Sequence, residues 1–217
     1  AWAGTAAGVL PGCGAARLRQ EMELFPTWFL GRHLGLVLSG AEKAMLEDTF
    51  AVLERAALAQ PQVLVHRDYH SRNLMVCTDN PGVLDFQDAV VGPVSYDLVS
   101  LLKDCYITWP RERVLGWVDR YRALAGQSGL ELPGSREEFV RSFDLMGAQR
   151  HIKVLGIFAR LWYRDGKAGY LPDLPRVLDY TLAVTRSDPL LADLDRFLVA
   201  RVVPAFPAAQ ARELGTP

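Results

Sequence analysis

The feature that most constrains this chain is a loop motif followed, a short distance later, by a single carboxylate. Residues 66–73 read His-Arg-Asp-Tyr-His-Ser-Arg-Asn, and Asp85 follows in the run Leu-Asp-Phe. An apolar run precedes the motif, and turn-forming residues at 78–82 separate two strand-like runs. The spacing therefore predicts a β-hairpin whose arms bring Asn73 and Asp85 together.

The expected pairing of this hairpin sets the geometry of the site. We expect Cys77 to pair with Val83. Asn73 then falls within about two positions of Asp85. An amide oxygen and a carboxylate are hard ligands, which suit a magnesium ion that carries nucleotide phosphates. Asp68, on the loop that feeds the first arm, is placed to accept or orient the proton of an attacking hydroxyl.

The joint pattern is typical of a kinase-type phosphoryl-transfer centre, with a base, a metal-binding amide and a metal-binding carboxylate. For any one residue a structural interpretation competes, because a single Asp in a turn commonly caps the backbone or faces solvent. The loop, the hairpin and the carboxylate together favour catalysis. His66 is expected to be structural, with its ring bonded to nearby backbone, and His70 either packs the loop or contacts substrate. No spacing of His and Cys indicates a zinc site.

These residues resemble the aminoglycoside phosphotransferase and choline kinase family, which shares the catalytic layout of protein kinases. The resemblance implies that Asp68 is the catalytic base and that Asn73 and Asp85 are the metal ligands. It also implies that Asp97, at the start of the next helix, supports the catalytic loop, to which the structural role expected of His66 would add. The cofactors that the resemblance implies are Mg²⁺ and ATP, the latter as co-substrate.

Two departures from protein kinases argue for a small-molecule substrate. Gln87 stands where a D-F-G motif would have glycine, and no A-P-E segment follows. Within the family, residues 21–35 and 84–89 are similar to bacterial sugar kinases that phosphorylate the anomeric hydroxyl of N-acetylmuramate and N-acetylglucosamine. This resemblance covers about residues 15–205.

Contacts to the acceptor are predicted from cationic and aromatic side chains. Basic residues recur along one face of the predicted long helix, where they would bind an anionic or hydroxylated sugar at the mouth of a pocket. The alternative is a basic stripe that faces solvent. A loop tryptophan would stack on a sugar face. The candidates are His70, Arg72, Trp109, Arg150, His151 and Lys153.

The resemblance further implies an N-terminal lobe of strands, with a phosphate-covering loop and a lysine, which we do not find before residue 15. Residues 1–14 are small and Gly-rich, and the first lysine, Lys43, falls in a predicted helix. We therefore expect an α+β fold that is mainly α: the C-terminal lobe of a protein-kinase-like fold without its N-terminal β lobe. The expected parts are an irregular segment at 1–14, the lobe at 15–205 and a frayed tail at 206–217.

Start and stop signals predict the helices of this lobe. Capping boxes at Ser39 and Ser135 open helices that run to about residues 59 and 165. Further helices are expected at 97–105 and 111–125. Another opens at Asp188 and Pro189 and ends before Pro204.

Composition limits the classes of function. The 24 basic and 25 acidic residues give a net charge of −1, which offers no case for nucleic acid or an acidic membrane surface. No apolar run reaches the length of a membrane span. The three cysteines indicate free thiols in a reducing compartment, so we expect a cytoplasmic protein.

The best-supported function is an ATP- and Mg²⁺-dependent phosphotransferase of small molecules, most simply an amino-sugar kinase. Without the nucleotide lobe, we expect this lobe alone to bind nucleotide poorly, which would leave it inactive. The first alternative is an aminoglycoside or choline-type phosphotransferase, whose substrate is an amino alcohol. The second is a non-catalytic binding module without a nucleotide lobe. A weaker third is a hydrolase that uses the same metal site on water.

Overall fold

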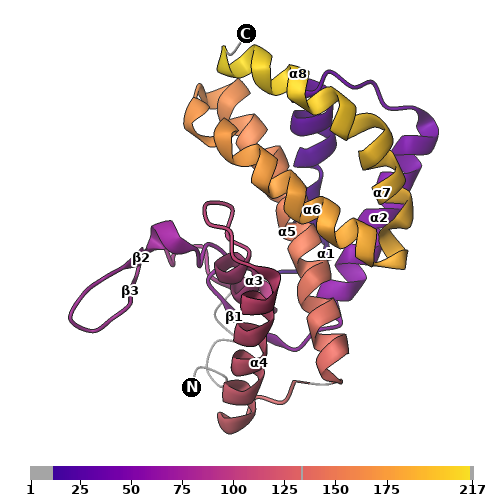
Figure 1. The fold of residues 1–217 in the computed structure, drawn as a ribbon. Coiled ribbons are helices and arrows are strands. Elements are labelled where there is room, and N and C mark those ends of the chain that lie inside the picture. Colours follow the sequence, from indigo (N-terminus) through magenta and orange to yellow (C-terminus); the bar gives the residue numbers. More distant parts are fainter. Residues whose placement is uncertain (1–11, 133, 216–217) are drawn as a thin grey trace. The chain divides into compact units, whose positions relative to one another are not determined.

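A computed structural model describes residues 12–132 and 134–215 (Figure 1). The chain divides into two compact units. Unit 1 consists of Ala1–Ala15 and Arg55–Gly147, and unit 2 consists of Ala16–Glu54 and Ala148–Pro217. Helices α2 (Gly40–Leu58) and α5 (Arg136–Asp165) contribute residues to both units. No helix in the described part of the chain combines the length and apolarity needed to cross a membrane.

The strands lie in unit 1 and form two antiparallel pairs. Within the described residues they are β1 (Gln62–Val65), β2 (Leu74–Met75), β3 (Gly82–Val83) and β4 (Val90–Pro93). β1 pairs with β4, with Val65 opposite Val90, and both side chains are buried. Helices α3 (Tyr96–Leu102) and α4 (Arg111–Gln127) follow β4. This predominance of helix over two short sheets confirms the expected α+β, mainly α class.

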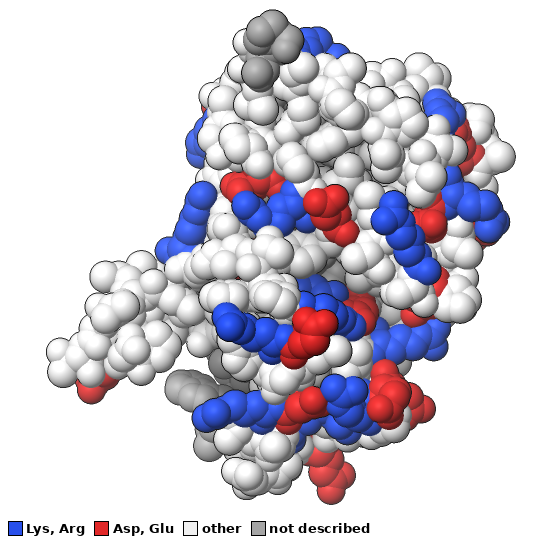
Figure 2. Space-filling model, viewed as in Figure 1, with Lys and Arg blue, Asp and Glu red and all other residues white. Residues whose placement is uncertain are grey.

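The β2–β3 hairpin forms where the sequence predicts it, but the predicted register is wrong by three residues. Val83 pairs with Leu74 rather than with Cys77. The Cys77 thiol donates to the backbone oxygen of Asp79 at 3.2 Å, so Cys77 belongs to the turn and not to the strand. The turn therefore takes in residues 76–81. Figure 2 shows that the hairpin surface is largely uncharged, and Val76 is 93% exposed.

Both predicted capping boxes form. The Ser39 amide donates to the Glu42 carboxylate at 2.7 Å, and the Glu42 amide donates to the Ser39 hydroxyl at 3.2 Å. Ser135 and Glu138 make the same reciprocal pair at 2.6 and 3.1 Å. Because these bonds satisfy amides that have no partner within the helix, α2 and α5 begin next to the two serines. α5 ends at Asp165, as predicted.

Every regular element in the described part of unit 2 is a helix or a helical turn. Its elements other than α2 and α5 are α1 (Ala15–Met22, of which Ala15 belongs to unit 1), a π-helix (Phe25–His33), a 3₁₀ segment (Ala168–Asp173), α6 (Leu174–Ser187), a 3₁₀ turn (Pro189–Leu191), α7 (Ala192–Phe197), a second π-helical stretch (Leu198–Val202) and α8 (Val203–Leu214). Phe25 and Phe29 stack in the core with ring centroids 5.5 Å apart. Gly156 of α5 lies against the backbone of Leu24, where an added Cβ would meet the carbonyl carbon at 2.4 Å.

The end of the chain differs from expectation. The predicted stop before Pro204 is wrong, since Pro204 lies in the first turn of α8, where its missing N–H has no partner to lose. The expected frayed tail from residue 206 is a helix as far as Leu214, with Phe206 and Ala209 buried. Gly215 ends it at φ 66°, a left-handed conformation that suits glycine.

The opening segment lies mostly outside the described residues, which begin at position 12. Gly12 forms a parallel bridge with Val91, and the Cys13 amide donates to the Val91 oxygen at 2.7 Å. The described end of the expected irregular segment thus lies beside β4 in unit 1.

Candidate functional site

The predicted catalytic loop, residues 66–73, begins where β1 ends. The backbone amides of His66 and Arg67 donate to the two carboxylate oxygens of Asp97 at 2.6 and 2.9 Å. Asp97 lies in the first turn of α3. Arg67 has φ 76°, a left-handed conformation that is unfavourable for a residue with a Cβ. The paired bonds to Asp97 therefore hold the loop in a shape that the backbone alone would not favour.

The middle of the loop gathers around the backbone oxygen of Asp68. That oxygen accepts from the His70 amide and from the Asn73 side-chain Nδ2, each at 3.0 Å. Ser71–Asn73 form a single 3₁₀ turn that leads into β2. Because Nδ2 of Asn73 is used within the loop, its Oδ1 is the side-chain atom left to coordinate a cation.

The second proposed metal ligand lies next to the first. The amide of Leu84 donates to the Asn73 oxygen at 3.0 Å, which extends the β2–β3 register by one pair. Asp85 is therefore one position from the residue opposite Asn73, closer than the two positions expected from the incorrect register. Asp85 has φ 63°, and the Gln87 side chain donates to its Oδ1. Gln87, which replaces the D-F-G glycine, thus orients the carboxylate.

A further carboxylate, not singled out in the sequence, reaches the same loop. Asp104 is 1% exposed; its Oδ2 accepts from the Ser71 amide and its Oδ1 from the Tyr106 amide, both at 2.9 Å. Its partners are backbone groups, which leave no trace in residue spacing.

The preceding Lys103 pairs with Asp144 at 2.7 Å. Burial lowers the pKa of Lys103, and the attraction of Asp144 opposes that change.

The loop side chains rest on aromatic rings. The His66 ring meets Tyr69 edge-on at 5.9 Å, and both of its nitrogens are buried without a hydrogen-bond partner among the described residues. The expected bond from that ring to backbone is therefore wrong. His70 meets the Tyr106 ring edge-on at 5.4 Å, and the Arg72 guanidinium lies 3.5 Å from the centroid of the same ring.

The remaining predicted acceptor contacts are distributed over both units. Trp109, in unit 1, packs edge-on against Trp117 of α4 at 5.3 Å. Arg150, His151 and Lys153 belong to the part of α5 in unit 2, and all three are buried. Lys153 pairs with Glu21 at 2.9 Å, and the His151 ring is stacked on a tyrosine. The alternative of a solvent-facing stripe is therefore wrong for Arg150 and Lys153.

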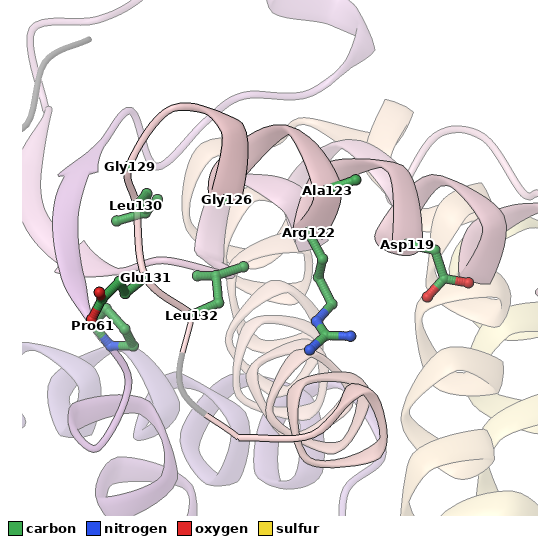
Figure 3. A pocket seen from close by; sticks show the side chains of 9 residues that line it. All are labelled: Pro61, Asp119, Arg122, Ala123, Gly126, Gly129, Leu130, Glu131 and Leu132. Carbon is green, nitrogen blue, oxygen red and sulfur yellow. The ribbon is translucent and has the colours of Figure 1, made fainter.

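A wide hollow in unit 1 contains none of the predicted site residues. It has a volume of about 1030 Å³, and the nine residues that line it are labelled in Figure 3. They come from Pro61, from α4 and from the segment that follows it. Pro61 precedes β1 whereas His66 follows it, so the hollow and the catalytic loop lie at opposite ends of this strand.

Comparisons with known proteins agree with the motif. The model of the phosphotransferase enzyme family matches residues 9–139. N-acetylmuramate/N-acetylglucosamine kinases of Pseudomonas aeruginosa and Pseudomonas putida are 50% and 51% identical over 194 and 189 residues, or 89% and 87% of this chain. A kinase of the same name from Caulobacter vibrioides is 36% identical over 82% of the chain. The chain spans 57%, 56% and 48% of the length of these three proteins.

Proposed function

We propose that this chain, which belongs to the phosphotransferase enzyme family, carries the catalytic centre of an ATP-dependent amino-sugar kinase. The observation that carries the proposal is the hairpin register, in which the residue before Asp85 is bonded to Asn73. The Asn73 side chain is in turn bonded to the backbone of Asp68. A base, an amide and a carboxylate are thus linked through one short stretch of backbone.

The donor set fits magnesium. Asn73 Oδ1 and the Asp85 carboxylate are hard oxygen ligands, and both belong to the catalytic loop and its hairpin. No group of three or more His, Cys, Asp or Glu side chains in the described chain is arranged to hold a metal. The site would therefore take its remaining ligands from water and nucleotide phosphates, as Mg²⁺ commonly does. The bound ion would neutralise charge on the phosphate oxygens.

Asp68 is assigned the proton transfer. Its carboxylate would orient the acceptor hydroxyl and take its proton as that oxygen attacks the terminal phosphorus of ATP. A new oxygen–phosphorus bond would form while the bond from that phosphorus to the leaving ADP breaks. The Asn73 side chain would contribute twice, because its Nδ2 is bonded to the backbone oxygen of Asp68 and its Oδ1 would hold the cation. The position of the base is in this way coupled to the position of the metal ligand.

We infer an amino sugar as the acceptor because the relatives of about 50% identity are named N-acetylmuramate/N-acetylglucosamine kinases. His70 and Arg72 flank Ser71 between the base and the ligand, which supports them as acceptor or phosphate contacts. Trp109, Arg150, His151 and Lys153 stay predictions, as does a cytoplasmic location.

A substrate screen of the natural full-length protein tests the proposal. With ATP and Mg²⁺, we expect phosphorylated product from N-acetylmuramate or N-acetylglucosamine, and not from aminoglycosides or choline. Preference for the latter would favour the amino-alcohol alternative. Phosphate release without any acceptor would favour a hydrolase, and no turnover at all would favour a binding module.

Substitutions then test the residue roles. Asp85→Asn should lower kcat/KM by at least about a hundredfold, because a metal ligand loses its charge. Asp68→Asn should lower kcat with less effect on nucleotide binding. Asp79→Asn provides a matched control, since Asp79 is exposed in the turn of the same hairpin. Full activity in Asp85→Asn would refute its assignment.

A further inference from the structure

Asp104 is a buried carboxylate whose observed partners are both backbone amides. It lies two residues beyond the end of α3, in unit 1, and is 1% exposed. A charge in such a position is tolerated only when hydrogen bonds replace its hydration. The amides of Ser71 and Tyr106 supply those bonds, one to each oxygen, both at 2.9 Å. The carboxylate therefore joins the segment after α3 to the catalytic loop.

The bond to Ser71 fixes the start of the turn that ends on a proposed metal ligand. Ser71 opens the 3₁₀ turn and Asn73 closes it. An amide at the start of a helical turn has no partner within the turn, and a carboxylate is a strong acceptor for it. If Asp104 holds this amide, the turn cannot rotate, and the Asn73 side chain keeps its bond to Asp68.

The bond to Tyr106 fixes the surface on which neighbouring loop side chains rest. The Tyr106 ring contacts the His70 ring at 5.4 Å and the Arg72 guanidinium at 3.5 Å. In the sequence, His70 precedes Ser71 and Arg72 follows it. One carboxylate therefore anchors the loop backbone and also the aromatic ring that supports the loop side chains.

We propose that Asp104 is a positioning residue that holds the second half of the catalytic loop, as Asp97 holds the first. Asp97 binds the amides at 66 and 67, and Asp104 binds the amide at 71. The proposal rests on the proposed function, because the geometry that Asp104 maintains is that of Asp68 and Asn73. The proposal assigns Asp104 no contact with substrate or metal, since its observed partners are backbone amides.

A double-mutant cycle on the natural full-length protein tests this inference. Asp104→Asn keeps the shape of the side chain but leaves one of the two amides without an acceptor. Ser71→Pro removes the amide itself, at the first position of a helical turn, where proline is tolerated. The preceding His70 is extended, at φ −125° and ψ 170°, which suits a residue before proline. Ser71→Ala, which keeps the amide, is the reference for Ser71→Pro.

We expect Asp104→Asn to lower kcat about 10- to 100-fold with little change in the KM for ATP. In the Ser71→Pro background, Asp104→Asn should lower kcat by less than about threefold, because the bond from the amide of residue 71 to the side chain of residue 104 is already absent. Asp48→Asn, an exposed change on α2, is the charge-matched control. Independent effects that multiply in the double variant, or a wild-type kcat in Asp104→Asn, would overturn the proposal.

Amide hydrogen exchange gives a second measurement that needs no activity. Exchange at Ser71 or Tyr106 should be at least tenfold faster in Asp104→Asn than in the wild type, while amides of α8 are unchanged. Unchanged amide hydrogen exchange at both Ser71 and Tyr106 would contradict the inference. Absence of sugar phosphorylation by the wild type would count against the proposed function instead, so the two failures are distinguishable. If Asp104→Asn does not fold, the kcat of Ser71→Pro can still be compared with that of Ser71→Ala. Equal kcat values in these two variants would show that the amide at residue 71 is not needed, and would contradict the proposal.

Discussion

Asp97 uses both carboxylate oxygens to hold the first two residues of the catalytic loop. In Asp97→Asn one of the amides at His66 and Arg67 would face an NH₂ group instead of an acceptor. A buried amide without an acceptor costs about 1–3 kcal/mol. The left-handed backbone at Arg67 would lose a restraint as well.

We therefore expect the free energy of unfolding of Asp97→Asn to fall by about 1–3 kcal/mol, and kcat to fall with it. Urea unfolding and steady-state kinetics measure the two effects. Asp48→Asn serves again as the control. A variant with wild-type stability and wild-type kcat would show that Asp97 does not support the loop.

Single residues differ in how well the sequence predicts their place. The proximity of Asn73 and Asp85 follows from spacing, because a hairpin brings its two arms together whichever of several registers it adopts. The contacts of Asp104 do not follow, since backbone amides are present at almost every position and carry no residue-specific signal. The burial of Lys153 depends on Glu21, which is 132 positions away in the sequence.

Whole elements show the same division between local and distant causes. The starts of α2 and α5 were predictable because a capping box lies within four consecutive residues. The hairpin register was not, because the bond from the Cys77 thiol widens the turn. Helix α8 was missed because Pro204 can end a helix or begin one, and only the burial of Phe206 and Ala209 decides between them.

Helix α8 should make unit 2 sensitive to acid. Burial would raise the pKa of Glu213, but hydrogen bonds from Trp162 and Arg212, each at 2.8 Å, outweigh it and lower the pKa to about 2. Because folding lowers the pKa of this carboxyl, the ionised group stabilises the folded state at pH values above 4.5. This stabilisation is lost as the pH falls from 4.5 toward 2.

Trp162→Phe removes one of these bonds and should bring the pKa of Glu213 back toward its ordinary value. The unfolding temperature should then decrease less between pH 5 and pH 3 than it does in the wild type, as a thermal scan across about this range would measure. Trp117→Phe, in unit 1, should keep the wild-type pH dependence. Equal dependence in all three proteins would contradict the role of the Trp162 bond.

At the scale of the whole molecule, the cysteines provide a measure of how tightly unit 1 is closed. Cys77 is exposed in the hairpin turn, whereas Cys13 and Cys105 are 3% and 5% exposed in the same unit. A thiol reagent should therefore modify one cysteine quickly in the native protein and the other two only when unit 1 opens. All three should react in denaturant.

Timed labelling followed by mass spectrometry measures these reactions. Cys77→Ser should abolish the fast reaction and leave the slow ones unchanged. Two or three fast thiols in the native protein would contradict the burial of Cys13 and Cys105. The two-unit division itself was not predictable from the sequence, because the boundaries fall inside the continuous helices α1, α2 and α5.

The hairpin ladder closes on the Met75–Gly82 pair, and residues 76–81 extend beyond it without contributing a proposed ligand. Lengthening a surface loop adds little entropy cost, because the cost grows only with the logarithm of its length. An epitope or a small fluorescent tag grafted between positions 78 and 79 would thus be tolerated, while the Leu84–Asn73 bond still holds Asp85 beside Asn73. The turn offers an attachment point for reporters a few residues from the proposed chemistry.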